Sequence, residues 1–217
     1  NSLGSNKALV IDGVIPTITN VTSTTNDGTY KSGDVIAITV TFSEVVNVVT
    51  TNGTPTLTLE TGSSDASVNY ASGSGSNTLT FNYTIADGQN SSDLDYATTS
   101  ALALNSGTIK DVAGNGATLT LASPGASNSL GANKAIVVDT TPPSIAQVTS
   151  TTNDGTYKSG EVIAITINLS EAVVVSGTPQ LTLETGSSDA VVNYSSGSGS
   201  STLVFNYTVA NGHTSSD

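Results

Sequence analysis

The side chains of this sequence that could do chemistry are almost all carboxylates. The 217 residues include 17 Asp and Glu against five Lys, with no Arg, no Cys and one His, for a net charge of −12. Without Cys there is no thiol catalysis, disulfide or thiolate metal site, and one imidazole cannot build a histidine metal cluster. Carboxylate and carbonyl oxygens remain, and these are the ligands that hard cations prefer. Ca²⁺ is therefore the cofactor that we expect.

The same charge balance argues against two classes of partner. Nucleic acids and anionic membrane surfaces are bound through clusters of basic side chains, which five scattered lysines cannot supply. Every apolar run is shorter than the ~18 residues typical of a membrane-spanning helix. We therefore expect neither nucleic-acid binding nor membrane insertion. There is also no initiator Met and no signal peptide, so the sequence is expected to belong to a longer chain.

An internal repeat defines the elements that must position the carboxylates. Residues 21–44 return at 148–171 with 20 of 24 residues identical, and residues 53–93 return at 177–217 with 32 of 41 identical. Residues 1–12 match residues 128–139 in the same way. We predict three parts, which are the last strand of a preceding repeat at 1–12, a complete immunoglobulin-like repeat at 13–139, and a second repeat at 140–217 that is incomplete at its C-terminus.

Within each repeat, apolar and polar residues alternate with the period of β-strands. Residues 36–42 and 79–85 show this pattern most clearly, with an apolar residue at every second position. No segment has a helical period, and turn residues separate the runs. About seven short strands in roughly 125 residues are typical of an antiparallel sandwich. We predict an all-β fold of tandem immunoglobulin-like antiparallel β-sandwiches.

The sequence also resembles a known family. The string DTTPPSIAQVTSTTNDGTYKSGEVIAITINLSE, the strings GTPQLTLETG and STLVFNYTVANG, and DLDYATTSALALNSGTIKDVAGN of the first copy are similar to the bacterial immunoglobulin-like tandem repeats of giant calcium-dependent surface adhesins and large secreted repeat proteins. The resemblance covers essentially the whole chain. It implies an extracellular or bacterial cell-surface location, tandem stacking, and calcium at or near domain junctions. One departure is GVI at 13–15 in place of TTP at 140–142, which predicts a less stiff first junction.

Strand alternation assigns the carboxylates to the two ends of each sandwich, because the chain reverses direction at every loop. Both ends are then acidic, and stacked repeats would repel each other without a bridging cation; Ca²⁺ takes six to eight oxygen ligands. The preferred Ca²⁺ ligands are Asp12, Glu44 and Asp111 at the first junction. Their equivalents at the second junction are Asp139 and Glu171. The second-choice ligands are Asp27, Asp93 and Asp95.

Each candidate also has a simpler interpretation. Asn-Asp-Gly strings are common in hairpins, so Asp27 could serve only its turn, and the DVAGN string that begins at Asp111 could likewise be only a tight turn. Glu44 could be a solvated residue at a strand end. Asp93 and Asp95 have a spacing that paired catalytic carboxylates also use. No base or aromatic cleft accompanies that pair, which argues against catalysis.

Three functions remain, and they differ in class. The first is a structural extender repeat of a large bacterial cell-surface or secreted adhesin, stiffened by calcium at its junctions. The second is a carbohydrate- or protein-binding module, and the third is an accessory domain of a secreted polysaccharide-degrading enzyme. Near-identical repeats and few aromatic anchors favour the extender, and His213 is Gln89 in the other copy, which argues against an enzyme. Neighbouring repeats of the same chain are the expected partners, with strand exchange through the incomplete repeat as a secondary hypothesis.

Overall fold

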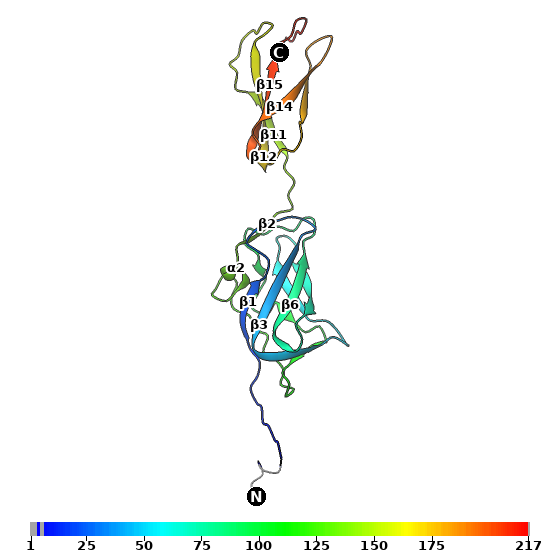
Figure 1. The fold of residues 1–217 in the computed structure, drawn as a ribbon, viewed down its shortest axis with the longest axis vertical. Helices are drawn as coiled ribbons and strands as arrows, with labels where there is room; N and C mark the ends of the chain where they lie inside the picture. The colour runs from blue at the N-terminus through cyan, green and yellow to red at the C-terminus, as the bar shows by residue number, and fades with distance from the viewer. Residues whose placement is uncertain (1–3, 5–6, 217) are drawn as a thin grey trace. The chain divides into compact units, whose positions relative to one another are not determined.

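The computed structural model describes residue 4 and residues 7–216, and nearly all of its secondary structure is β-strand (Figure 1). This confirms the predicted all-β class. The chain divides into two compact units, Asn1–Thr141 and Pro142–Asp217. Among the described residues, no helix has the length and apolar character needed to cross a membrane.

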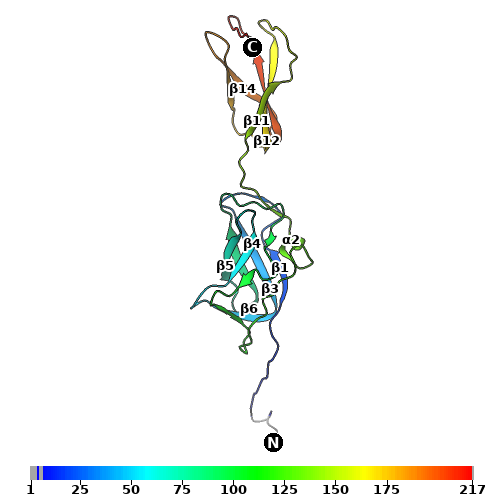
Figure 2. The same cartoon turned by 180° about the vertical axis from the view of Figure 1, so that it is seen from behind.

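The strands of unit 1 (Asn1–Thr141) curl around one core in a half-barrel arrangement (Figures 1 and 2). The main strand order is β1 (Ile18–Ser23), β3 (Val35–Val49), β6 (Ser76–Thr84), β5 (Ala66–Ser72), β4 (Thr56–Glu60) and β7 (Asp95–Tyr96). In addition, β8 (Leu102–Ala103) pairs with β4, and β9 (Thr108–Lys110) pairs with β3. All of these pairs are antiparallel, as predicted.

Strand β3 pairs with different neighbours along its length. Its first part pairs with β1 and β6, the register with β6 shifts between Thr41 and Val46, and the segment from Asn47 pairs with β9. A register shift of this kind bends a strand and turns side chains away from the regular alternation. Glu44 lies within the shifted segment, so the bend determines where its carboxylate points.

The predicted alternation of apolar residues is confirmed in the core of unit 1. The large apolar residues at the alternating positions of 36–42 and 79–85 are at most 2% exposed, namely Ile36, Ile38, Val40, Phe42, Leu79, Phe81, Tyr83 and, just after β6, Ile85. Branched and aromatic side chains suit a pleated surface with one buried face. The half-barrel is therefore held together mainly by this β3–β6 face and the residues packed on it.

The last part of unit 1 returns to its first strands. Helix α2 (Leu130–Asn133) is a single turn capped by Ser129, whose hydroxyl accepts a hydrogen bond from the Ala132 N–H at 3.2 Å. The Asn133 amide donates to the Val21 carbonyl at 2.7 Å, which ties the turn to β1. Strand β10 (Ile136–Val138) then pairs in parallel with β2 (Gly28–Tyr30), a pairing that the sequence did not predict because its partners are far apart in the chain.

Unit 2 (Pro142–Asp217) repeats five strands of unit 1, namely β1, β3, β4, β5 and β6, with the same neighbours. Its order is β11 (Ile145–Ser150), β12 (Val162–Val173), β15 (Ser200–Thr208), β14 (Ala190–Ser196) and β13 (Gln180–Leu183). The second copy in this sequence ends at the counterpart of Asp93, so residues 94–139 occur once. In unit 1 this part of the chain packs on β1, where Asn128 and Asn133 form hydrogen bonds with the backbone of Val21. Val21 of β1 is accordingly 0% exposed, whereas its counterpart Val148 is 55% exposed.

The N-terminal segment forms no strand over residues 7–12, and Val10 and Ile11 are almost fully exposed. Residues 1–3, 5 and 6 of the predicted last strand, and Asp217 at the end of the second repeat, lie outside the described residues. The assignment of residues 1–12 to a preceding repeat, with the boundaries at 13–139 and 140–217, stays a prediction.

The hairpin between β5 and β6 offers a test of the backbone geometry. Gly73 and Gly75 both have positive φ, but a Cβ on Gly73 would lie 2.1 Å from the Thr78 carbonyl oxygen, whereas one on Gly75 would meet nothing within 4 Å. We expect Gly75→Ala to cost about 1–2 kcal/mol of unfolding free energy from backbone strain. Gly73→Ala should cost about 3 kcal/mol or more, because a steric clash is added.

The measurement is native-state hydrogen exchange of the β3 and β6 amides in the full chain, which reports the free energy of opening unit 1. Gly75→Ala is the matched control, since it changes the same hairpin without the clash. Equal losses for the two variants would show that the hairpin is not packed as described.

Candidate metal centre

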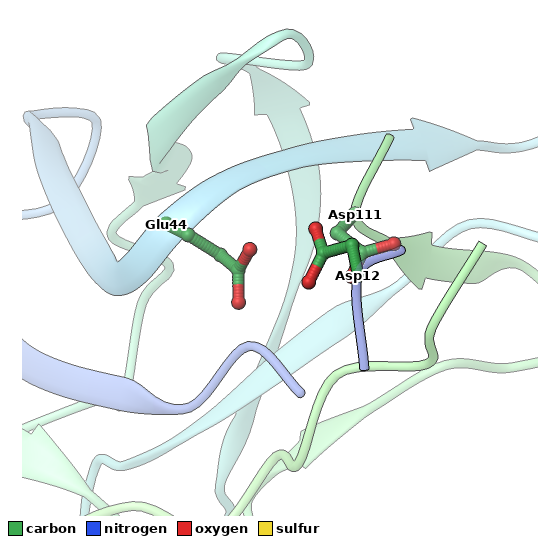
Figure 3. Close-up of side chains that lie close together, drawn as sticks. All are labelled: Asp12, Glu44 and Asp111. Carbon is green, nitrogen blue, oxygen red and sulfur yellow. The ribbon is translucent and has the colours of Figure 1, made fainter. Parts of the chain in front are cut away.

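Three carboxylates from separate parts of the sequence meet at one end of unit 1. Asp12 precedes β1, Glu44 lies in the bend of β3, and Asp111 directly follows β9. Each offers an oxygen within 4.8 Å of the other two, and Figure 3 shows Glu44 reaching from β3 toward Asp12 and Asp111. The structure thus brings together the three preferred ligands of the sequence analysis. Metal binding by them stays a prediction.

Asp111 is almost fully buried and organises the turn that follows β9. Its Oδ1 accepts hydrogen bonds from the N–H groups of Gly114 at 2.6 Å and Asn115 at 2.7 Å, and its Oδ2 accepts from the Asn115 side-chain amide at 2.7 Å. Desolvation raises the pKa of Asp111, but hydrogen bonds from Asn115, Gly114 and Ala113 outweigh it and hold the pKa below its ordinary value. Asp111 therefore closes a tight turn and is also kept ionised beside the other two carboxylates.

Asn115 links this turn to the segment that carries Asp12. Its side-chain amide also donates to the backbone carbonyls of Asp12 at 3.2 Å and Val14 at 3.1 Å. Asp12 is exposed, and its Oδ1 accepts from the Val14 N–H at 3.1 Å. The Asp12 carboxylate is thus held next to the turn by backbone and amide contacts rather than by burial.

Ser43 fixes the same segment against β3, next to Glu44. The Thr17 N–H donates to the Ser43 hydroxyl at 3.0 Å, and the Ser43 N–H donates to the Thr17 carbonyl at 2.8 Å. The sequence analysis did not identify Ser43. The available signal was the Ser-Glu pair at the end of the strand, which recurs as Ser170 and Glu171.

Glu44 carries the least satisfied oxygen of the cluster. Its Oε1 is buried. Among the residues that the structure describes, it is the one buried side-chain nitrogen or oxygen for which no hydrogen-bond partner is found. Desolvation raises the pKa of Glu44, and the negative charges of Asp12 and Asp111 raise it further. A buried carboxylate oxygen without a donor is unfavourable unless a cation or proton offsets its charge. The cluster therefore has the electrostatics of a cation site.

The geometry and chemistry of the cluster fit Ca²⁺. Oxygens that bind one Ca²⁺ at about 2.3–2.6 Å lie no more than roughly 5 Å apart, and the three carboxylates meet that limit. All donors are oxygens, which suits a hard cation. Asp12, Glu44 and Asp111 would supply its protein ligands, while backbone carbonyls and water would complete a shell of six to eight.

Asp93 and Asp95 form a separate pair beside α2. A Cβ built on Gly131 would lie 3.0 Å from Asp95 Oδ2 and 3.3 Å from Asp93 Oδ2, so both carboxylates crowd this glycine. Asp95 is buried and accepts hydrogen bonds from the N–H groups of Tyr96 and Gly125. Desolvation, then the charge of Asp95, raises the pKa of Asp93. The structure gives Asp95 a structural role and does not bring the pair to the cluster of Asp12.

The candidates of the second junction keep the local geometry of the first. Asp139 Oδ1 accepts from the Thr141 N–H at 3.0 Å, as Asp12 accepts from Val14. Within unit 2, Ser170 next to Glu171 exchanges hydrogen bonds with Ser144 as Ser43 does with Thr17. A counterpart of Asp111 is absent from the sequence. A cation site at Asp139 and Glu171 stays a prediction.

Asp27 is engaged in a contact within unit 1. It forms an ion pair with Lys134 Nζ at 3.0 Å and accepts a hydrogen bond from the Ala135 N–H at 3.3 Å. The Lys134 contact, followed by the Ala135 N–H, lowers the pKa of Asp27. This carboxylate therefore joins the β2 loop to the segment before β10 and lies apart from the cluster.

We expect the Asp27 contact to make the stability of unit 1 depend on acid pH. Because the folded-state pKa is lowered, the stabilisation is complete above the ordinary Asp pKa and is lost as the pH falls through the folded-state value. Asp27→Asn should lower the stability at pH 7 and flatten its decline below about pH 4. Hydrogen exchange and thermal unfolding across pH 2–7 would measure this.

Asp154→Asn is the matched control for that experiment. Asp154 is the counterpart of Asp27 in unit 2, and no ion pair is found for it among the described residues. The control should leave the pH profile of unit 1 unchanged. An unaltered profile in Asp27→Asn would contradict the prediction.

Comparison with protein families agrees with this architecture. The family described as Bacterial Ig-like domain matches residues 6–124, a stretch that contains β1 to β9 and all three carboxylates of the cluster. No match was found among curated proteins. The family match covers more than half of the sequence, and the remainder largely repeats the matched part. The chain therefore belongs to the bacterial Ig-like domain family.

Proposed function

We propose that this chain is a structural extender segment of a large bacterial cell-surface or secreted adhesin, and that Ca²⁺ stiffens the junction before unit 1. The observation that carries the calcium proposal is the buried, partnerless Oε1 of Glu44 beside Asp12 and Asp111. Among the described residues, no basic side chain forms an ion pair with these three carboxylates. Three carboxylates held together in this way are a costly arrangement that a bound cation turns into a favourable one.

The proposed cation would act on the path of the chain. Asp12 belongs to the segment that leads into the unit, whereas Glu44 and Asp111 belong to the strands and turn of its body. Binding all three to one ion would fasten that segment to the body. Gly13 directly follows Asp12 and leaves the backbone there free to rotate, so the segment has most to gain from such an attachment.

Domains of this family are typically non-catalytic. The position of the one histidine in this chain likewise supports a structural rather than a catalytic role. His213 Nδ1 lies 2.8 Å from the Tyr207 hydroxyl, and the two rings stack. In unit 1 the counterpart Gln89 accepts a hydrogen bond from the Tyr83 hydroxyl, also at 2.8 Å. His213 thus fills a structural position that an amide fills in the other copy.

Thermal unfolding of the full chain with Ca²⁺ and with a chelator tests the proposal. We expect Ca²⁺ at about 100 times its dissociation constant to stabilise unit 1 by ~2.7 kcal/mol, with Mg²⁺ as the ion control. Glu44→Gln should abolish this response. Without Ca²⁺ the variant should be at least as stable as the wild type, because it removes a charge from the cluster.

Glu171→Gln is the matched control, because the same substitution is then made at the equivalent strand position of unit 2, outside the cluster of Asp12, Glu44 and Asp111. It should retain the full calcium response of unit 1. An equal response in Glu44→Gln and the wild type would exclude this site. No response in the wild type would exclude calcium stiffening while leaving the extender role.

A binding module is the second candidate, supported by a groove that both units share. In unit 1 the groove has a volume of about 520 Å³ between the diverging strands β5 and β6, and in unit 2 about 600 Å³ between β14 and β15. The side chains of Asn69 and Asn82 are exposed along it. Saturable binding to a glycan array that is lost in Asn82→Ala would favour this candidate over the extender.

A further inference from the structure

Residues 7–12 repeat the sequence of the strand that closes unit 1. The segment KALVID at 7–12 matches KAIVVD at 134–139, which contains β10. In unit 1, β10 pairs in parallel with β2, and its Ile136 is fully buried. Residues 7–12 form no strand, and Val10 and Ile11 are at least 91% exposed. This segment therefore has the sequence of a paired, buried strand but no strand partner in the part of the chain that the structure describes.

In unit 1 the closing strand is attached at both ends of β2. The Gly28 N–H donates to the Ala135 carbonyl at 3.0 Å, and the Asp139 N–H donates to the Tyr30 carbonyl at 2.9 Å. A strand with the sequence of β10 thus needs from its neighbour a Gly-Thr-Tyr edge with an N–H at the first residue and a carbonyl at the third.

Unit 2 has such an edge without a strand on it. Residues 155–157 repeat the Gly-Thr-Tyr sequence of β2. Among the described residues, no hydrogen bond is found for the Gly155 N–H or for the Tyr157 carbonyl. Unpaired backbone groups at the edge of a sheet are a template for an added strand.

This edge of unit 2 already has the local geometry of its occupied counterpart. The Tyr157 hydroxyl donates to the Asn153 carbonyl, and the Ala164 N–H donates to the Thr152 hydroxyl at 2.8 Å. The corresponding residues of unit 1 form the same two hydrogen bonds. An edge that is ordered before binding lowers the entropic cost of adding a strand.

The charges at the two sites are complementary. In unit 1 the Lys134 Nζ lies 3.0 Å from Asp27 Oδ1, at the start of the paired segments. The counterparts of these two residues are Lys7 and Asp154. Both are exposed, and no ion pair is found for either of them among the described residues. Lys7 and Asp154 would form the equivalent ion pair if residues 7–12 lay on the edge of unit 2.

We propose that residues 7–12 of one molecule add to residues 155–157 of a second molecule of the same chain as a parallel strand, in the place that β10 has in unit 1. The register of β10 on β2 gives the expected pairs, which are Leu9–Gly155, Val10–Thr156 and Ile11–Tyr157. Backbone hydrogen bonds supply the affinity of such strand addition, and side chains select the register. The proposal goes beyond the extender role and does not depend on the calcium site.

Carbodiimide cross-linking of the full chain tests the pairing, because the reagent joins a lysine amine to a carboxylate that contacts it. Unlabelled chain is mixed with chain labelled with a heavy nitrogen isotope, in the presence of a chelator, and the linked peptides are identified by mass spectrometry. We expect Lys7–Asp154 links that join labelled to unlabelled peptides, with a yield that rises severalfold with chain concentration. The Lys134–Asp27 link is the internal control, since it should join peptides of one isotope at every concentration.

Val10→Pro separates strand pairing from a contact between two charged side chains alone. In unit 1 the residues bonded to β2 alternate and include Ala135 and Asp139, so Val137, the counterpart of Val10, belongs to the same set. Proline removes the N–H, and the Lys7–Asp154 yield should fall about fivefold through the lost hydrogen bond. Val10→Thr keeps the N–H and the branched side chain, and should retain the yield.

Thermal unfolding of both variants should match the parent, because Val10 is exposed and outside the core. Lys7–Asp154 links confined to peptides of one isotope would overturn the proposal of a second molecule. Links from Lys7 spread evenly over the acidic residues of unit 2, or an unchanged yield in Val10→Pro, would overturn the strand pairing. Failure of the calcium site at Glu44 would leave these results unaffected.

Discussion

Strand β3 must pair with neighbours on two sides of one core, and much of unit 1 depends on how it does so. Its first half is buried between β1 and β6, while its end pairs with β9. The bend between these parts interrupts regular pairing, and there the strand can present a carboxylate instead of another core residue. Because β9 leads directly into Asp111, the pairing that completes the half-barrel also brings the second carboxylate to the first. Packing of the core and assembly of the acidic cluster therefore have a common cause.

The two copies of the repeat show what the C-terminal third of a unit contributes. The five strands that the two units share are similar in sequence and pair in the same order. Yet the buried set in unit 2 is confined to Ala190, Val192, Phe205 and Tyr207 among its described apolar residues. The first part of the repeat, which both units contain, is thus sufficient for strand pairing. Burial of the apolar face also needs the C-terminal part of the unit, which contains β7, β8, β9, α2 and β10. Burial of a side chain such as Val21 contributes about 1.5–3 kcal/mol, so the closing segment is a large part of the stability of the unit.

The sequence was sufficient for those features that depend on local pattern. Alternation in residues 36–42 and 79–85 identified the core face, and loop reversal grouped Asp12, Glu44 and Asp111 at one end. The parallel β2–β10 pair, the cap at Ser129 and the contacts of Ser43 and Asn115 were not foreseen. Each depends on two segments that are distant in the chain, and a single sequence carries no signal for such contacts. Asp27 shows the same limit, because its partner Lys134 is recognisable only after the last strand has docked.

Under the proposed extender role, the parallel pairing of β10 with β2 has a mechanical consequence. A pull on the chain beyond Asp139 acts lengthwise on β10, so the pairs Ile136–Gly28, Val137–Thr29 and Val138–Tyr30 are loaded in shear and share the force. Pairs loaded in this way must fail together, whereas a strand peeled from its end loses them one at a time. The ladder that bears the load is closed by the last residues of the unit to be synthesised. A repeat that has emerged only in part therefore lacks the β2–β10 ladder through which its folded body would be loaded in shear.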